Sequence, residues 1–265
     1  MRMHDKIEEL LNKIIQGDCL EIMKDISDDS IDMILTDPPY GVSEKGVFET
    51  PEKNYKRVYE EWDIDVEELT KKFIKESYRV LKNGGAIYIT CSFHNLRLCW
   101  DALEKEGFTF RNNFVFAKTN AMPIKLAKQI GIYAYSYENA LYFTKGVTKT
   151  FNYNYLKAIN GGKQFRDFMI ITNKDRSSRF GKHLHPCEKP LPVFELFIHA
   201  SSNKDDIVLD PFVGSGTTAV ACKKLNRKFI GIEIEPEYCK IAKKRLVNIP
   251  SRLETFTLFN KKNGR

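Results

Sequence analysis

Apolar and polar positions follow two different patterns along the chain. Short apolar runs bounded by turn residues alternate with longer stretches in which apolar residues recur every three or four positions. A short apolar run predicts a buried strand, and recurrence at helical spacing predicts an amphipathic helix. The predicted strands are residues 31–36, 86–91, 108–116, 207–210 and 229–233. The predicted helices are residues 69–81, 95–105, 190–200, 217–225 and 236–247.

Strands that alternate with helices favour an α/β fold with a doubly wound, mostly parallel sheet. Asn83-Gly84-Gly85 is predicted to end the helix before it. Two stretches break the alternation: residues 41–65 are predicted to be a long mobile loop, and residues 120–182 an irregular insertion between two halves of the sheet. The predicted units are residues 1–119, 120–182 and 183–265.

Length and composition narrow the class of protein. The chain has 265 residues, 42% of them apolar and 29% charged, which is ordinary for a globular protein of one large domain. No apolar run approaches the ~18 residues of a membrane span, and the first residues lack the features of a secretory signal. The six cysteines form no CxxC pair, which favours reduced thiols over disulfides or a metal site. We therefore expect a soluble cytoplasmic protein with no membrane partner and no metal.

The positive charge is concentrated in the middle of the chain. The net charge is +7, yet residues 118–189 hold 13 Lys and Arg against four acids, and many aromatic residues lie among them. Such a stretch can neutralise phosphates and stack on bases, although a solvated basic face explains the charge equally well. Residues 240–265 form a second basic stretch, predicted to be an amphipathic helix followed by a loose end.

A glycine-rich motif follows the predicted strand 207–210. It reads DPFVGSGTTA and opens the helix 217–225, so its glycines let a ligand approach the backbone where the helix N-terminus favours an anion. Glu233 lies 19 residues after Gly214, at the end of the next predicted strand, where a carboxylate can accept both hydroxyls of a ribose. The motif indicates a cofactor that contains a nucleoside, and by itself it does not separate NAD from S-adenosylmethionine.

A second motif, DPPY at residues 37–40, ends the predicted strand 31–36. Two prolines have fixed φ angles and donate no N–H, so the carbonyl groups around them are rigidly aimed. The Asp37 carboxylate and the Pro38 carbonyl can accept both hydrogens of an exocyclic base amine and free its lone pair for attack. The ring of Tyr40 can stack on the base.

Together the two motifs resemble those of the DNA amino-methyltransferases that use S-adenosylmethionine. DPPY comes first, then the basic segment, then DPFVGSGT, and this order is similar to the permuted β-class. His185-Pro-Cys-Glu-Lys189-Pro resembles the HPxxKP element of that family. The resemblance implies a Rossmann-like, seven-stranded methyltransferase sheet in which residues 120–182 form the target-recognition region. As partners it implies DNA, a second copy of the chain and a separate cognate restriction endonuclease.

Roles carry over residue by residue. The resemblance implies that Glu233 holds the ribose, that Asp18 binds the adenine amine of the cofactor, and that Lys189 helps to bind the methionine carboxylate. Asp37 in place of Ser resembles the adenine-N6 members rather than the cytosine-N4 members. The implied catalytic residues are Asp37, Pro38, Pro39 and Tyr40. The implied cofactor-binding residues are Asp18, Asp37, His185, Lys189, Asp210, Phe212, Gly214, Ser215, Gly216, Thr217, Thr218 and Glu233.

The sequence therefore predicts a site-specific DNA methyltransferase that modifies the N6 atom of an adenine flipped out of the duplex. The alternatives are a cytosine-N4 DNA methyltransferase and an amino-methyltransferase that acts on RNA or single-stranded DNA. An NAD-dependent oxidoreductase would leave DPPY and the basic segment unexplained. A DNA-binding module without activity would not need Asp37 or the glycines.

Overall fold

The computed structural model describes residues 3–39, 66–119, 131, 133–171 and 189–249 of the 265-residue chain. Within these ranges the strands are β1 (Lys13–Gln16), β2 (Ile31–Thr36), β3 (Leu81–Cys91), β4 (Thr109–Lys118), β5 (Tyr137–Thr144), β6 (Phe168–Ile171), β7 (Ile207–Asp210) and β8 (Lys228–Glu233). The helices are α1 (Met3–Leu10), α2 (Cys19–Met23), α3 (Val66–Val80), α4 (Leu96–Glu106), α6 (Tyr153–Ile159), α8 (Leu191–Ser201), α9 (Thr217–Lys224) and α10 (Pro236–Val247).

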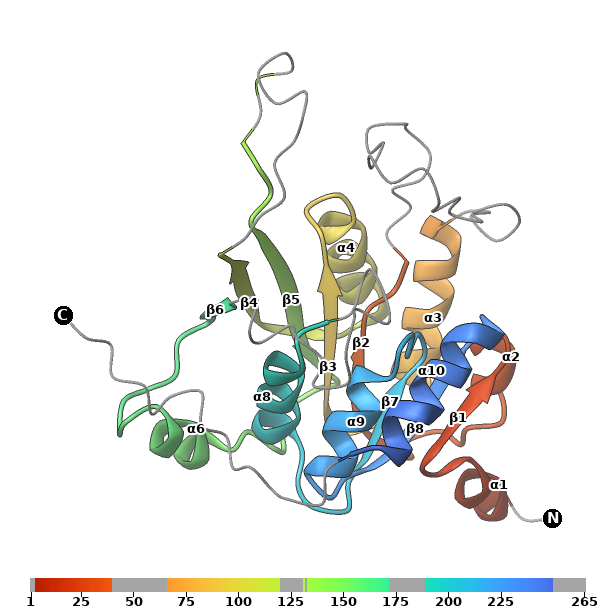
Figure 1. The fold of residues 1–265 in the computed structure, drawn as a ribbon. Helices are drawn as coiled ribbons and strands as arrows, with labels where there is room; N and C mark the ends of the chain where they lie inside the picture. Colours follow the sequence, from red (N-terminus) through yellow and green to blue (C-terminus); the bar gives the residue numbers. More distant parts are fainter. Residues whose placement is uncertain (1–2, 40–65, 120–130, 132, 172–188, 250–265) are drawn as a thin grey trace.

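The described strands form one sheet in the order β1-β8-β7-β2-β3-β5-β4-β6 (Figure 1). Neighbouring strands run parallel except at β5, which is antiparallel to both β3 and β4. The predicted mostly parallel, doubly wound sheet is confirmed. In the described residues the sheet has eight strands, where seven were predicted, and the short edge strand β6 pairs with the end of β4.

Two hydrophobic cores lie on opposite faces of the sheet. One contains buried residues of α6, α8, α9 and α10, and the other contains buried residues of α1, α2, α3 and α4. Successive strand residues point to opposite faces, so Met33 and Leu35 of β2 join the first core while Ile34 joins the second. Strands buried on both faces are continuously apolar, which is why residues 31–36 were recognisable in the sequence.

Residues 120–182 were predicted to be an irregular insertion between two halves of the sheet. This prediction is wrong for β5 and β6, which are strands of the sheet. β5 lies inside the sheet between β3 and β4, with Tyr88 opposite Tyr142, and β6 extends the edge. β5 contains the apolar run at residues 140–143, and it pairs with β3 and β4, which are separate segments of the chain. The target-recognition role of residues 120–182 stays a prediction.

The glycine pair after α3 does not end that helix. α3 ends at Val80, and Asn83, Gly84 and Gly85 lie within β3. The register against β2 jumps there from Ile31↔Leu81 to Met33↔Ala86, and Gly84 has a φ of +86°. Extra residues in one strand form a bulge, which a glycine with positive φ accommodates.

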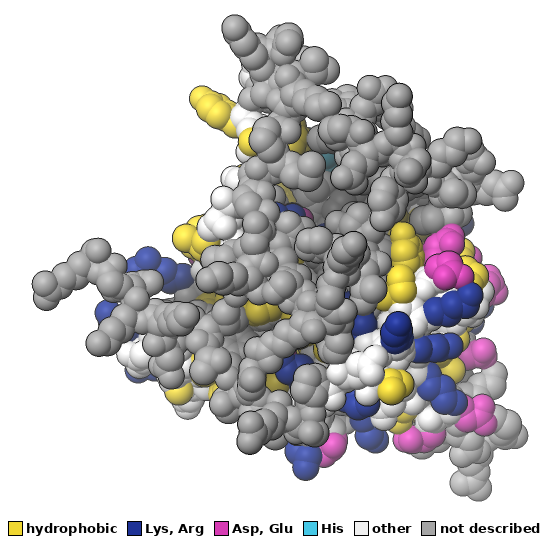
Figure 2. Space-filling model, viewed as in Figure 1, with side chains coloured by type: hydrophobic (Ala, Val, Ile, Leu, Met, Phe, Trp, Pro, Cys, Tyr) yellow, Lys and Arg dark blue, Asp and Glu magenta, His cyan; other side chains and the backbone are white. Residues whose placement is uncertain are grey.

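The second basic stretch is described as far as Asn248-Ile249. Its first residues form the last two turns of α10, where Lys240, Lys243 and Lys244 are exposed. Figure 2 shows Lys and Arg side chains gathered over this part of the displayed face, with acidic side chains among them. Among the described helices, none is long and apolar enough to cross a membrane.

Candidate active site

Four of the predicted acidic residues meet at one edge of the sheet. β1, β8, β7 and β2 are consecutive parallel neighbours, so their carboxyl ends lie together (Figure 1). Asp37 follows β2, Asp210 ends β7, Glu233 ends β8, and Asp18 follows β1. The crevice outside the carboxyl ends of the strands is where open α/β sheets bind their ligands.

Asp210 is 3% exposed and accepts three hydrogen bonds. Thr36 Oγ1 donates to its Oδ1 at 2.7 Å, Thr218 Oγ1 donates to its Oδ2 at 2.5 Å, and the Phe212 amide donates to Oδ1 at 3.1 Å. Burial raises the pKa of Asp210 to about 7, although these hydrogen bonds oppose the rise. Asp210 therefore fastens the start of the glycine turn to the end of β2.

The glycine turn connects β7 to the N-terminus of α9. Gly214 has a φ of +51°, and Gly216, the N-cap of α9, has a φ of +87°. A Cβ at Gly216 would lie 2.9 Å from Ala242 Cβ, because α10 packs against the turn. A Cβ at Gly214 would approach no atom closer than 4.0 Å, so the space beside Gly214 is open.

Glu233 lies directly beside this open space. The Gly214 amide donates to Glu233 Oε2 at 2.9 Å, and the Glu235 amide donates to Oε1 at 2.9 Å. Burial raises the pKa of Glu233, and the two backbone hydrogen bonds oppose the rise. Both oxygens are held in fixed positions, and each keeps a further lone pair with which it can accept from a ligand.

Asp18 and Phe212 border the same region. The Gly17 amide donates to the Glu233 carbonyl at 3.0 Å, which places Asp18 next to the end of β8. Asp18 caps α2 by accepting from the Leu20 amide at 2.7 Å. Phe212 is half-buried and packs edge-on against Phe73, with ring centroids 5.2 Å apart.

The hydroxyl groups at the start of α9 take part in internal contacts. Arg245 Nη1 donates to Ser215 Oγ at 2.9 Å and to the Ser215 carbonyl at 2.8 Å, and it lies 3.4 Å from Thr217 Oγ1. Thr218 donates to Asp210, as described above. The hydroxyl of Thr218 therefore positions Asp210, and a role of Ser215, Thr217 or Thr218 toward a methionine carboxylate stays a prediction.

Asp37, the acidic residue of the DPPY motif, forms an ion pair with a lysine. Lys189 Nζ lies 3.0 Å from Asp37 Oδ2, and Thr90 Oγ1 donates to Asp37 Oδ1 at 2.5 Å. Pro38 is buried and Pro39 is half-buried. The structure thus joins Asp37 and Lys189, which the sequence analysis placed in different motifs. Tyr40 and His185 lie outside the described residues.

Sequence reasoning missed three members of this arrangement, namely Thr90, Lys118 and Glu138. Glu138 Oε2 lies 3.0 Å from Lys189 Nζ, and Lys118 Nζ pairs with Glu138 Oε1. Burial alone would raise the pKa of Glu138, but the charges of Lys189 and Lys118 lower it to about 2. The available signal was an acid two residues before an apolar run within the basic segment.

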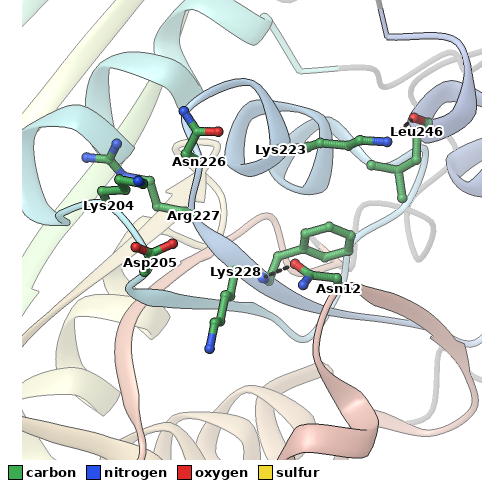
Figure 3. Close-up of a pocket in the computed structure, with 9 residues that line it drawn as sticks. Asn12, Lys204, Asp205, Lys223, Asn226, Arg227, Lys228 and Leu246 are labelled. Carbon is green, nitrogen blue, oxygen red and sulfur yellow. Dashed lines mark hydrogen bonds between the residues drawn. The ribbon is translucent and has the colours of Figure 1, made fainter.

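A surface cavity lies at the opposite, amino-terminal edge of the sheet (Figure 3). Lys204, Lys223 and Arg227 contribute positive charge to it, and it includes none of the predicted site residues. Lys223 Nζ donates to the Leu246 carbonyl, and Arg227 donates to the Leu225 carbonyl. Cations at the carbonyl ends of helices have a structural explanation, because they satisfy unpaired carbonyl groups there. Among the described residues, no group of three or more His, Cys, Asp or Glu is placed to hold a metal.

The fold and the carboxyl-edge site together define a Rossmann-like α/β protein with a glycine turn and an acidic Asp-Pro-Pro loop. Residues 31–244 match the DNA methylase family, and the chain belongs to that family. Type II methyltransferase M2.LlaDCHI of Lactococcus lactis subsp. cremoris is 37% identical over 242 residues, which cover 88% of each chain. Type II methyltransferase M2.DpnII of Streptococcus pneumoniae is 36% identical with the same coverage.

Solved structures agree with this assignment. The crystal structure of the M1.HpyAVI–SAM complex is 32% identical, covers 89% of this chain and 99% of its own, and has a TM-score of 0.65. The cytosine-N4-specific PvuII DNA methyltransferase is 20% identical with a TM-score of 0.69, and this likeness shows the shared fold. The protein is therefore a DNA methyltransferase, and the predicted restriction-modification family is confirmed.

Proposed function

We propose that this enzyme methylates the exocyclic N6 atom of adenine within a short sequence of double-stranded DNA. Membership of the DNA methylase family supports the general activity, methylation of DNA with S-adenosylmethionine. The proposed specificity for adenine N6 rests on Asp37, because the adenine-N6 members carry Asp at this position, where cytosine-N4 members more often carry Ser. The single observation that carries the mechanism is the Asp37 carboxylate held at the mouth of the sheet by Lys189 and Thr90.

The carboxyl-edge residues fit S-adenosylmethionine. Glu233 offers a fixed carboxylate to the ribose hydroxyls, and the space that a Cβ at Gly214 would enter is open beside it. Asp18 lies at the neighbouring strand end, where its remaining acceptor capacity suits an adenine amine. The N-terminus of α9 favours the negative charge of the methionine carboxylate. When bound, S-adenosylmethionine supplies a methyl group on a sulfonium, and transfer forms an N–C bond while the C–S electron pair stays on sulfur.

Asp37 and Pro38 prepare the amine for attack. A base amine is a poor nucleophile because its lone pair is delocalised into the ring. Asp37 accepts one amine hydrogen, and the Pro38 carbonyl, whose direction the consecutive prolines fix, accepts the other. The nitrogen then moves toward tetrahedral geometry with its lone pair aimed at the methyl group. Asp37 also faces the proton that the amine releases afterwards, so orientation and electrostatics supply most of the rate.

The target base has to leave the duplex to reach this edge of the sheet. The excess of positive charge in residues 118–189 supports contacts with the DNA backbone, because that segment contains thirteen Lys and Arg but only four acids. The curated relatives are type II methyltransferases, which supports a cognate restriction endonuclease as a separate partner.

Methyl transfer from labelled S-adenosylmethionine to unmethylated DNA, followed by nucleoside analysis, tests this function. We expect N6-methyladenine at one short motif with the wild-type enzyme. Asp37→Ala should abolish transfer and leave binding of S-adenosylmethionine largely intact, while Asp101→Ala, which alters an exposed carboxylate of α4, should keep full activity. N4-methylcytosine would overturn the base assignment, and normal turnover by Asp37→Ala would overturn the mechanism.

A further inference from the structure

A row of alternating charges runs from the DPPY motif into the sheet. Lys189 Nζ lies 3.0 Å from Asp37 Oδ2 and 3.0 Å from Glu138 Oε2, and Lys118 pairs with the other oxygen of Glu138. We propose that Glu138 is a positioning residue for methyl transfer, which shares the charge of Lys189 and so keeps the Asp37 carboxylate an effective acceptor. This inference rests on the role of Asp37 proposed above.

The row is shielded from water. The side chains of Lys189, Glu138 and Asp37 are 10%, 15% and 22% exposed. Charges act strongly on one another in such surroundings, since little solvent screens them. The pKa of Glu138, which burial would raise, is lowered to about 2 by Lys189 and Lys118, so Glu138 is ionised at every pH at which the enzyme can work.

The sheet fixes the position of Glu138 relative to Asp37. Glu138 lies on β5 opposite Phe116 of β4, and the Lys118 amide donates to the Ser136 carbonyl at 2.6 Å. Thr90, the second partner of Asp37, lies on β3 opposite Ala140 of β5. Three neighbouring strands therefore carry the groups that surround Asp37, and Lys189 is held between two carboxylates that the backbone keeps in place.

The balance of charge explains why Glu138 should affect the reaction. Two cations and two anions in the row cancel one another. Without the Glu138 charge, the row carries one excess positive charge, and Asp37 is the carboxylate of the row that still pairs with Lys189. Asp37 then accepts more weakly from the amine, and the excess charge opposes the positive charge that develops on the attacking nitrogen. The chemical step should slow, while groups that bind the cofactor at Glu233 and Asp18 are unaffected.

Three variants of the full-length enzyme test the proposal. Glu138→Gln keeps the shape and removes the charge, and Glu138→Asp keeps the charge on a shorter side chain. Glu195→Gln is the matched control, because Glu195 is also buried and paired with a lysine, Lys224, on helices away from the DPPY motif. The measurements are the single-turnover methyl-transfer rate, the Kd values for S-adenosylmethionine and DNA, and thermal unfolding.

We expect Glu138→Gln to lower the single-turnover rate roughly 10- to 100-fold, with both Kd values within about threefold of the wild type. Glu138→Asp should recover part of the rate, and Glu195→Gln should lose stability without losing rate. An unchanged rate in Glu138→Gln, or an equal loss in Glu195→Gln, would overturn this inference while the wild-type activity leaves the proposed function intact. A wild-type enzyme that transfers no methyl group to any DNA would overturn both.

Discussion

Replacement of Asp210 by asparagine should stabilise the enzyme increasingly as pH rises. Asp210 is buried at the start of the glycine turn and has a pKa of about 7 in the folded protein, because burial disfavours its charged form. Asparagine has almost the same shape and no charge. Its carbonyl oxygen can accept from Thr36 and the Phe212 amide, and Thr218 Oγ1 has an alternative acceptor in the Leu35 carbonyl at 3.5 Å.

The direction of this pH dependence follows from whether Asp210 holds a proton in the folded and in the unfolded chain. Below a pH of 3.8, the ordinary value, Asp210 is neutral in both the folded and unfolded chain and no penalty exists. As pH rises toward 7, the unfolded chain releases the proton while the folded protein retains it, so stability falls. Above pH 7 the penalty levels off at about 4 kcal/mol, the free energy that corresponds to the difference between the two pKa values.

Urea unfolding of the wild type and Asp210→Asn between pH 5 and pH 8 measures this effect. The difference in unfolding free energy between the two proteins should grow by about 3 kcal/mol in favour of the variant over that range. Asp101→Asn, which changes an exposed carboxylate, should give a difference that does not vary with pH. A constant difference for Asp210→Asn would show that Asp210 ionises normally in the folded enzyme, and the reasoning from burial would be refuted.

Four other substitutions address the glycine turn and the exposed rings beyond β3 and β5. Gly216→Ala should destabilise the enzyme by about 2–4 kcal/mol in thermal or urea unfolding, because it combines a φ of +87° with a Cβ 2.9 Å from Ala242. Gly214→Ala has only the positive φ and should cost about 1 kcal/mol, so equal losses in both variants would contradict the packing argument. Phe93 follows β3 and Tyr135 precedes β5, and their exposed rings have centroids 4.7 Å apart. Replacement of either ring by alanine should weaken DNA binding roughly 5- to 100-fold. Unchanged affinity in a fluorescence-anisotropy titration would remove these rings from the DNA interface.

The local elements of the second half of the chain were determined by the sequence. The predicted strand 207–210 and helix 236–247 agree with β7 and α10, and the helix from residue 217 agrees with α9 to within a residue. These elements depend on short-range causes, namely hydrophobic periodicity, turn glycines and prolines at helix starts. The same causes placed Asp210, Gly214 and Glu233 at strand ends, so their gathering at one edge followed once the strands were parallel.

Pairing between distant strands was decided only by the tertiary structure. The sequence did not predict β5 inside the sheet, because its neighbours β3 and β4 are separate segments and strand register depends on the whole core. Glu138 therefore looked like an isolated acid in a basic segment. Its contact with Lys189 exists because β5 and the residue before Pro190 meet in space.

The hydroxyl groups of α9 show the same division. The sequence placed Thr218 at a helix start, where a ligand contact is a reasonable expectation, but folding directed its hydroxyl to Asp210. A motif fixes which chemical groups lie on a turn, because the turn is a local structure. Packing of remote segments decides which of those groups face a partner inside the protein, since burial leaves each polar atom to the neighbours that the fold brings to it.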